Sequence, residues 1–446
     1  MTEGIVIPSQ TLVSLVEDAR RRTLALVEDL SDEQLTVTRK AVVNPFCWEL
    51  GHVAFFYDLF LLRELDGSGP HLQNAPDLYD SFEVDHDGRW GLPLPDRRLT
   101  LDYLRTVHSA VIERLQRSSS DPAITRLSLL SILHEDMHCE ALAYMRQTLM
   151  YAAPAGHERS GALAFSVPGG GAWPGDVEVP GGTYRLGAEG SEPFVFDNEK
   201  WSHPVEVAPF RISRAPVTNA EFATFVEAGG YLERKYWSRP GWRWRRRAGA
   251  LQPAYWCRSP AGWVRRNFHQ MVPLEEHHPV VHVNWFEAEA YCAWAERRLP
   301  SEAEWDLAAS GSPSPAGGPG SCKRRYPWGE NEPGPTEAHL DGLRSGTVEV
   351  GAFPAGDSGF GCRQMIGNVW EWTADAFYPF PGYVVDPPYR EYSAPWFGDR
   401  KVLKGGCWMT TSRLISNRYR NFFAPDRFDV FAGFRTCALE PSTALR

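Results

Sequence analysis

The stretch Leu133-His134-Glu135-Asp136-Met137-His138-Cys139-Glu140 decides how the first third of this chain folds. It lies in a run, residues 123–151, that contains neither proline nor glycine and repeats its apolar positions at nearly helical spacing. Residues four apart on a helix share a face, so His134 and His138 can offer two imidazole nitrogens to one divalent metal ion. Neutral imidazole suits iron, zinc, copper or nickel. The stretch therefore predicts a helix that carries two ligands of a metal site.

A metal site needs a further ligand from elsewhere, and His52 is the best candidate. His52 lies in a second apolar stretch of helical spacing, residues 44–64. Two more helices are predicted at residues 9–30 and 99–116, with a capped restart at residues 31–34. Residues 65–99 are rich in proline, glycine and aspartate and are predicted to form a loop. Four helices with inward ligands predict a four-helix bundle, whose core commonly holds metal sites.

The same octapeptide contains His-Glu-x-x-His, the signature of zinc metalloproteases. The longer form of that signature requires a glycine and a third histidine further along the helix, and the chain continues instead with Ala141-Leu142-Ala143-Tyr144. A thermolysin-like site requires a downstream glutamate on another helix, but Pro154-Ala155-Gly156 interrupts the helix before Glu158. The sequence therefore disfavours a protease.

Length and composition set the outer bounds. A chain of 446 residues suggests two or three domains. The formal charge of -10 argues against nucleic acid or an anionic membrane as partner; the arginine-rich residues 243–247 are expected to form a solvated loop. The opening residues have neither the basic nor the apolar region of a signal peptide, so none is expected, and no apolar run approaches ~18 residues. The eight cysteines are scattered, which favours reduced thiols. We expect a cytoplasmic monomer.

The composition changes at about residue 152. Residues 154–176 are rich in glycine and proline and predict a linker between a first domain at 8–153 and a second at 177–440. Beyond the linker, short apolar runs alternate with turns, and they lie at residues 177–179, 183–186, 205–212, 280–283 and 401–403. Two helices are predicted, at residues 219–228 and 285–297. The second domain is therefore predicted to be mixed and rich in turns.

Ordered blocks of the second domain look like the formylglycine-generating-enzyme (sulfatase-modifying factor) domain, a C-type-lectin-like fold. The blocks are Val217-Thr218-Asn219-Ala220-Glu221-Phe222, His282-Val283-Asn284-Trp285, Arg298-Leu299-Pro300-Ser301-Glu302-Ala303-Glu304-Trp305, Tyr326-Pro327-Trp328-Gly329, Gly367-Asn368-Val369-Trp370-Glu371-Trp372, Leu403-Lys404-Gly405-Gly406 and Gly433-Phe434-Arg435. The two copper-binding cysteines of that family are matched here by Thr410 and Ile415, so its copper chemistry is not expected.

The first domain resembles the DinB-type bundle, and its combination with such a second domain resembles the ergothioneine-type sulfoxide synthases. The resemblance implies a non-haem iron(II) enzyme that uses O2 to join a chalcogen to C2 of the imidazole of hercynine, the Nα-trimethyl form of histidine. His52, His134 and His138 match the three iron ligands of that family. The predicted fold class is therefore α+β multidomain, a DinB-like four-helix bundle followed by a C-type-lectin-like domain.

The resemblance also implies roles for residues beyond the metal ligands. A tyrosine that passes a proton or hydrogen atom to the oxygen species should be Tyr389 or Tyr392, and the sequence does not separate the two. A trimethylammonium group wants an aromatic face, and a carboxylate wants donors such as the Asn421 amide. The predicted substrate-binding residues in this segment are Arg420, Asn421, Phe422 and Phe423.

Departures from the actinobacterial ergothioneine enzymes point to the chalcogen donor. Met137 stands where those enzymes have glutamine, and the loop stretch from Tyr79 to Trp90 offers Arg89 as its single arginine, so a dianionic γ-glutamylcysteine would be poorly neutralised. Met137 in the octapeptide and the loop pattern with Asp80, His86, Arg89 and Trp90 resemble the selenoneine synthase branch. That resemblance implies a selenosugar donor, and cysteine or another thiol is the alternative. Donor recognition is assigned to Met137 and to the loop residues Asp80, Asp85, His86, Arg89 and Trp90.

Two other classes remain open from the sequence. In one, the lectin-like half is a binding module and the bundle histidines are vestigial. In the other, the bundle is a DinB-like thiol transferase that uses zinc and no oxygen. Dependence of activity on iron would argue against the first class, and oxygen consumption with hercynine would argue against the second.

Overall fold

The computed structural model describes residues 5–439 apart from 120, 155–168, 191, 315–317, 319, 321 and 322. The chain divides into two compact units. The first comprises Met1–Ala155, Glu189–Asp197 and Val384–Pro395, and the second Gly156–Ala188, Asn198–Tyr383 and Trp396–Arg446. Two segments that follow residue 155 in the sequence therefore also belong to the first unit. Most of the predicted linker, and residue 440 at the predicted domain end, lie outside the described residues.

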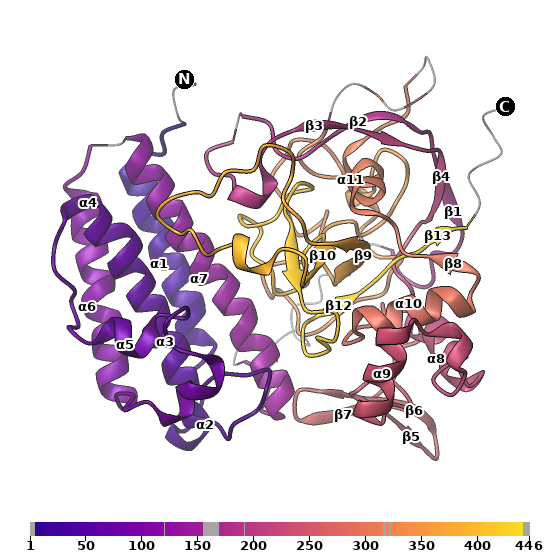
Figure 1. The fold of residues 1–446 in the computed structure, drawn as a ribbon, viewed down its shortest axis with the longest axis horizontal. Coiled ribbons are helices and arrows are strands. Elements are labelled where there is room, and N and C mark those ends of the chain that lie inside the picture. The colour runs from indigo at the N-terminus through magenta and orange to yellow at the C-terminus, as the bar shows by residue number, and fades with distance from the viewer. Residues whose placement is uncertain are drawn as a thin grey trace. The chain divides into compact units, whose positions relative to one another are not determined.

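The first unit is a helical bundle (Figure 1). Its elements are α1 (Ser9–Ala25), α2 (Asp32–Thr36), α3 (Phe46–Tyr57), a π-helical segment (Asp58–Arg63), α4 (Glu64–Asp66), α5 (Ala75–Tyr79), a 3-10 segment (His86–Gly91), α6 (Arg97–Gln116) and α7 (Pro122–Leu149). The four long helices pack as α1 on α6 and α7, and α3 on α6 and α7. The predicted four-helix bundle is confirmed. The predicted loop at residues 65–99 contains α5 and the 3-10 segment, two short helices without a periodic apolar pattern.

Local signals fix the ends of the helix that carries two of the predicted ligands. Asp121 caps α7, because its Oδ1 accepts hydrogen bonds from the amides of Ala123 and Ile124 at 2.8 and 2.9 Å. Pro122 occupies the first turn, where its missing N–H costs nothing. At the other end, the buried Arg146 donates to both carboxylate oxygens of Asp29 at 2.7 Å. This pair ties the end of α7 to the turn that follows α1.

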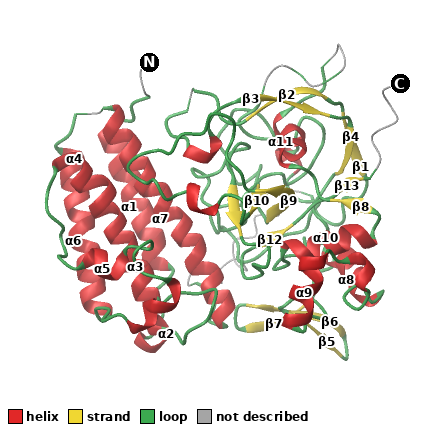
Figure 2. Ribbon diagram, in the orientation of Figure 1, coloured by secondary structure: helices red, strands yellow, loops and turns green. Residues whose placement is uncertain are grey.

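The second unit is a mixed α+β domain whose strands are short (Figure 2). Its helices are α8 (Asn219–Glu227), α9 (Arg239–Ala248), α10 (Trp285–Trp294) and α11 (Glu302–Ser310). Its strands are β1 (Asp176–Val179), β2 (Gly182–Leu186), β3 (His203–Val207), β4 (Phe210–Ser213), β5 (Trp256–Ser259), β6 (Gly262–Asn267), β7 (Gln270–Pro273), β8 (Arg297–Arg298), β9 (Trp370–Ala376), β10 (Lys401–Lys404), β11 (Asn421–Phe423), β12 (Ala432–Gly433) and β13 (Cys437–Ala438). The predicted fold class is confirmed.

The strands form four sheets, ordered β1-β4-β13-β8, β11-β10-β9-β12, β2-β3 and β5-β6-β7. The first sheet pairs Val177 with Ile212, so two predicted apolar runs meet on one buried face. The apolar run 205–212 is divided between β3 and β4, and the run 280–283 forms no strand although its valines are buried.

The arginine-rich stretch at residues 243–247 was expected to form a loop, and this expectation is wrong, because it lies in α9. Ser238 caps that helix by accepting a hydrogen bond from the Gly241 amide, and Gly249 ends it in the left-handed conformation. The two helices predicted from the sequence form as α8 and α10, each opened by a capping box.

A buried ion pair lies in the core of the second unit. Arg435 donates through Nε and Nη2 to the two oxygens of Glu371 at 2.6 and 2.7 Å, and Trp305 Nε1 donates to the same carboxylate at 2.8 Å. The other guanidinium nitrogen donates to the Ser213 carbonyl oxygen at 3.2 Å. Every charge in this cluster is therefore compensated by the fold itself.

The described residues contain no helix that is both long and apolar enough to span a membrane. No disulfide joins the seven described cysteines, and Cys322 lies outside the described residues.

Candidate metal centre

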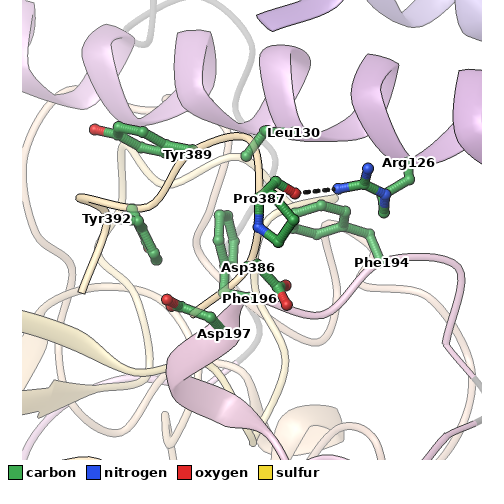
Figure 3. Close-up of a pocket in the computed structure, with 9 residues that line it drawn as sticks. All are labelled: Arg126, Leu130, Phe194, Phe196, Asp197, Asp386, Pro387, Tyr389 and Tyr392. Atoms are coloured by element: carbon green, nitrogen blue, oxygen red, sulfur yellow. Dashed lines mark hydrogen bonds between the residues drawn. The ribbon is translucent and has the colours of Figure 1, made fainter. Parts of the chain in front are cut away.

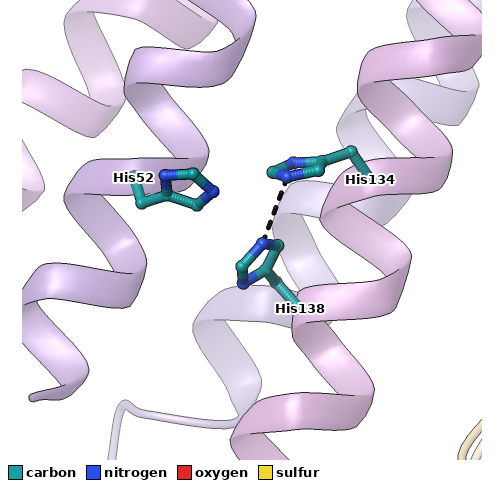
Figure 4. A group of neighbouring side chains, drawn as sticks. All are labelled: His52, His134 and His138. Carbon is teal, nitrogen blue, oxygen red and sulfur yellow. Dashed lines mark hydrogen bonds between the residues drawn. The ribbon is translucent and has the colours of Figure 1, made fainter. Parts of the chain in front are cut away.

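The three predicted ligand histidines meet inside the first unit. His52 comes from α3, and His134 and His138 come from successive turns of α7 (Figure 4). One ring nitrogen from each lies within 4.8 Å of the others. The Nε2 atoms of His134 and His138 are 3.2 Å apart. Two nitrogens bound to one metal ion at ~2.1 Å and at right angles are roughly 3 Å apart, so this spacing suits a shared ion.

The short helix α5 orients His52. His52 Nδ1 lies 2.8 Å from the Tyr79 carbonyl oxygen, and since a carbonyl only accepts, Nδ1 carries the hydrogen and Nε2 is left as the ligand atom. Trp48 Nε1 donates to the neighbouring Leu78 carbonyl at 2.8 Å. These are carbonyls at the C-terminal end of a helix, which lack intrahelical partners. Gly51 permits the approach, because a Cβ there would lie 2.2 Å from the Tyr79 ring.

A buried carboxylate orients His138. Glu49 Oε2 accepts a hydrogen bond from His138 Nδ1 at 2.5 Å, and Glu49 Oε1 accepts one from Asn44 Nδ2 at 2.5 Å. Burial alone raises the pKa of Glu49, but His138 and Asn44 outweigh it and hold the pKa at about 2. Such a carboxylate–histidine pair fixes the tautomer of a metal ligand. Glu49 is not among the site residues predicted from the sequence; its signal is a glutamate three positions before His52 in an otherwise apolar helix.

His134 completes the set. Its ring stacks on Phe56 with centroids 3.5 Å apart, and its Nδ1 is buried without a hydrogen-bond partner among the described residues. Burial lowers the pKa of His134 and lowers that of His52 to about 3, so both rings are neutral at physiological pH. Neutral ring nitrogens that converge on one point suit a divalent metal, and the residues present therefore fit the predicted iron.

Glu135, the glutamate of the protease-like signature, is used elsewhere. Its Oε1 accepts hydrogen bonds from Arg20 Nε at 2.9 Å and from the Thr23 hydroxyl at 2.7 Å, and its side chain is fully buried. Both partners lie on α1. A carboxylate held in a buried ion pair is not available as the general base that a metalloprotease requires, which agrees with the sequence argument against that class.

A cavity of about 230 Å³ opens beside His52. It is lined by His52, Phe55, Phe56, Leu59, Phe60, Asp80, Ser81, Phe82, Glu83, Pro388, Tyr389 and Glu391. Three of these described lining residues are acidic and none is a lysine or arginine. The cavity is therefore aromatic and negatively charged.

The two candidate tyrosines occupy different positions (Figure 3). The Tyr389 ring lies edge-on to His134, with centroids 6.0 Å apart, and packs on Phe56 at 5.0 Å. The Tyr392 hydroxyl donates to the Met137 sulfur at 3.7 Å, and its ring stacks on Phe196 at 4.6 Å. Tyr389, unlike Tyr392, also lines the cavity beside His52. Both tyrosines line a second cavity of about 20 Å³, room for one water molecule.

Comparison with known proteins covers both units. Residues 167–439 match the Sulfatase-modifying factor enzyme 1-like domain, and residues 15–140 match the DinB superfamily. Hercynine oxygenase of Mycolicibacterium smegmatis is 37% identical over 96% of this chain and 99% of that protein. Hercynine oxygenase of Mycobacterium tuberculosis is 38% identical over 94% and 96%. The chain belongs to the hercynine oxygenase family. Formylglycine-generating enzyme of Thermomonospora curvata is 34% identical over 60% of this chain and 94% of that protein.

Family membership confirms the prediction of an enzyme, an oxygenase with a three-histidine metal site. The individual substrate contacts predicted from the hercynine oxygenase resemblance stay predictions. In the loop, Asp80 lines the cavity, and its Oδ1 accepts a hydrogen bond from the Phe82 amide at 2.9 Å. Asp85 is exposed, while His86, Arg89 and Trp90 form hydrogen bonds to the segment preceding α3.

The other predicted contacts of the hercynine oxygenase type lie in the second unit. Arg420 is buried and donates to both oxygens of Glu302 at 2.6 and 3.0 Å and to the Asn198 carbonyl at 2.6 Å. Asn421 and Phe422 lie on β11, where the Asn421 side chain accepts the Phe422 amide at 2.8 Å. Phe423 follows on the same strand. The contacts of Arg420 within the unit account for its charge.

Proposed function

We propose that this chain is an iron(II)- and O2-dependent synthase that joins a chalcogen atom to C2 of the hercynine imidazole. The observation that carries the proposal is the convergence of three histidine nitrogens, two from buried rings and one from a half-buried ring, beside an acidic aromatic cavity, in a chain of the hercynine oxygenase family. Iron(II) bound there would supply open coordination positions for the substrates and the one-electron chemistry that activates O2.

The lining of the cavity suits the cationic end of hercynine. A quaternary ammonium group is recognised by aromatic faces. Phe56, Phe60 and Tyr389 are mutually in contact, with Tyr389 centroids 5.0 and 5.2 Å from the two phenylalanine rings. The carboxylates of Asp80, Glu83 and Glu391 add negative charge. Together the aromatic rings and the carboxylates stabilise a trimethylammonium group. A second cation would compete with that group for the same carboxylates.

Tyr389 is the better candidate for the proton donor. Its ring lies beside His134 and lines the cavity, and burial raises the pKa of its hydroxyl, so the phenol keeps its proton at neutral pH. We expect Tyr389→Phe to lower the rate of product formation by about 100-fold or more, the usual contribution of a positioned proton donor. Tyr392→Phe, which removes the hydroxyl next to Met137, is the matched control. Equal loss in both variants would contradict the assignment.

The chalcogen donor has two candidates. Membership of the hercynine oxygenase family supports sulfur, supplied by cysteine or γ-glutamylcysteine. With a thiol donor the C2–H and S–H bonds are replaced by a C–S bond and a sulfoxide S=O bond, and the second oxygen atom leaves as water.

The lining of the cavity supports a selenosugar. Among the described lining residues it offers no cation to neutralise a dianionic peptide, and its three carboxylates exceed the single positive charge of the trimethylammonium group, which leaves acceptors for sugar hydroxyls. Met137 presents a thioether rather than an amide beside Tyr392. We therefore propose the selenosugar as the donor that this cavity fits, with the sulfur donor as the alternative that family membership supports.

A parallel donor assay tests the proposal. Protein reconstituted anaerobically with iron(II) is given hercynine and one of three donors, a selenosugar, cysteine or γ-glutamylcysteine, and the reaction is started with air. Products are identified by mass, and oxygen uptake is recorded. A selenium adduct formed much faster than both sulfur adducts would establish the selenosugar, and sulfur adducts alone would establish the alternative.

Controls separate the other classes. Zinc-loaded protein should form no adduct, because zinc has no redox chemistry. Adduct formation without oxygen uptake would indicate a thiol transferase, and no adduct with any donor would refute the proposed synthase while leaving the fold intact.

A further inference from the structure

The second half of the loop between α5 and α6 is fastened to the segment that leads into α3. His86 Nε2 donates to the Val43 carbonyl oxygen at 2.8 Å, and Trp90 Nε1 donates to the Val37 carbonyl oxygen at 3.1 Å. Between them lies Arg89, whose side chain is only 9% exposed. A cation buried to this extent needs partners, because desolvation disfavours its charge.

Arg89 begins a chain of hydrogen bonds that ends at the metal ligand His138. Arg89 Nη1 donates to Asn44 Oδ1 at 2.8 Å, Asn44 Nδ2 donates to Glu49 Oε1 at 2.5 Å, and His138 Nδ1 donates to Glu49 Oε2 at 2.5 Å. Arginine can only donate and a carboxylate can only accept, so the orientation of the Asn44 amide is fixed from both sides. The ring of His138 is thereby held with Nε2 as its ligand atom.

Arg89 also contacts Trp48, whose ring packs against a second metal ligand, His52. Its guanidinium carbon lies 3.7 Å from the centroid of the Trp48 ring, which is a close cation–π contact. The same ring stacks on His52 with centroids 4.8 Å apart and planes inclined by 10°. Trp48 is 1% exposed, so its ring has little freedom to move. The Arg89 guanidinium is therefore connected to two of the three histidines through separate sets of contacts.

We propose that Arg89 is a positioning residue of the metal centre, acting on His138 through Asn44 and Glu49 and on His52 through Trp48. The inference rests on the proposed function, since it presupposes that the triad binds iron, but it is independent of the donor. It assigns Arg89 a different role from a clamp for donor carboxylates. A clamp would face the substrate, and Arg89 is not among the described residues that line the cavity beside His52.

Metal affinity tests the role without any substrate. Metal-free full-length protein is titrated anaerobically with Fe(II), and the Co(II)-loaded form is examined by its visible absorption, which reports ligand geometry. Arg89→Met and Asn44→Ala should each weaken Fe(II) binding by about 10- to 100-fold, the range for losing a partner of a metal ligand, and should shift the Co(II) bands. Arg89→Lys should recover part of the affinity, because lysine keeps a charge that can donate to Asn44.

Arg105→Met is the matched control, since that arginine is 70% exposed on α6 and pairs with the exposed Asp102. It should leave Fe(II) affinity unchanged. Asn44→Ala keeps the contact between Arg89 and Trp48 intact, so it tests the hydrogen-bond route even if Arg89→Met does not fold, as judged by circular dichroism.

Wild-type Fe(II) affinity and Co(II) bands in Arg89→Met and Asn44→Ala would overturn the inference. The same affinity combined with a raised KM for the donor would overturn it in favour of the clamp. Failure of the wild-type protein to bind Fe(II) at all would instead refute the proposed function.

Discussion

The metal centre of the first unit and the ion pair of the second unit treat buried polar groups in opposite ways. In the second unit, Arg435 and Glu371 satisfy each other and their neighbours. In the first unit, one ring nitrogen from each of His52, His134 and His138 lies within 4.8 Å of the others, and the Nε2 atoms of His134 and His138 are 3.2 Å apart. Buried polar groups that pair with each other stabilise the fold, whereas ring nitrogens that converge without a charged partner indicate a binding site for a metal ion.

The sharpest test of this comparison removes a converging group. His134→Ala should weaken Fe(II) binding by more than about 100-fold, because it deletes a ligand rather than the partner of a ligand. Anaerobic titration with Fe(II) measures the change. His108→Ala, which removes a histidine of α6 outside the triad, should bind Fe(II) as the wild type does. Tight binding by the His134 variant would mean that the triad is not the metal site.

Removing one member of the compensated pair should act on stability instead. Arg435→Met leaves the buried Glu371 carboxylate without its cation, which should lower the free energy of unfolding by about 3–5 kcal/mol. Urea unfolding of the second unit followed by tryptophan fluorescence measures the loss. Arg247→Met removes an exposed pair with Asp426 in the same unit and should cost at most about 1 kcal/mol. A loss no larger than that in Arg435→Met would contradict the structural role.

Glu287 is a buried carboxyl group of the second unit whose hydrogen bonds do not fully offset the cost of burying its charge. Burial raises its pKa to about 7 despite the hydrogen bond from the Tyr231 hydroxyl. Because the folded state then holds the proton to higher pH than the unfolded state, the free energy of unfolding should fall as pH rises from about 4.5 to 7 and level off above that. The full decrease should be roughly 3 kcal/mol.

Glu287→Gln should flatten that part of the pH profile, because the amide keeps the shape of the α10 cap without titrating. Urea unfolding at several pH values between 4 and 8 checks the result. Glu221→Gln makes the same change at the corresponding cap position of α8, and it should leave the slope in place. An unchanged slope in Glu287→Gln would show that this carboxyl does not set it.

The smallest expected effect on stability comes from the close contact that orients His52. Gly51→Ala should lower the free energy of unfolding by about 1–3 kcal/mol, because its methyl group would collide with the Tyr79 ring. It should also weaken Fe(II) binding, since the Tyr79 carbonyl holds His52. Gly69→Ala, with open space around the added carbon, should change neither quantity. Weakened stability with full Fe(II) affinity would separate the packing from the metal site.

The metal ligands could be predicted from the sequence because two of them follow helical spacing and the third lies in a helix of clear apolar periodicity. Glu49 and Asn44 could not, because their role depends on contacts between α3, the segment before it and α7. Nor does any local pattern indicate that Val384–Pro395 joins the first unit, which is what brings Tyr389 next to His134. Two tyrosines three residues apart in an irregular segment carry no periodic signal that would separate them.

The second unit shows the same limit for secondary structure. Capping boxes mark α8 and α10, and both were predicted. The helix α9 was missed because its arginines and tryptophans give no apolar face that repeats over several turns. The density of charge in this short segment favours a loop, whereas the Ser238 cap and the terminal Gly249 set the two ends of a helix.

The helix α5 is only five residues long, too short to persist by itself. Two donors from α3, Trp48 and His52, hold its terminal carbonyls. By thermodynamic linkage, whatever stabilises His52 in its present orientation also stabilises this helix. The Asp80 amide donates to the Pro76 carbonyl at 3.2 Å across its last turn. Hydrogen exchange at that single amide should therefore slow when metal is added and report the occupancy of the centre from the protein side.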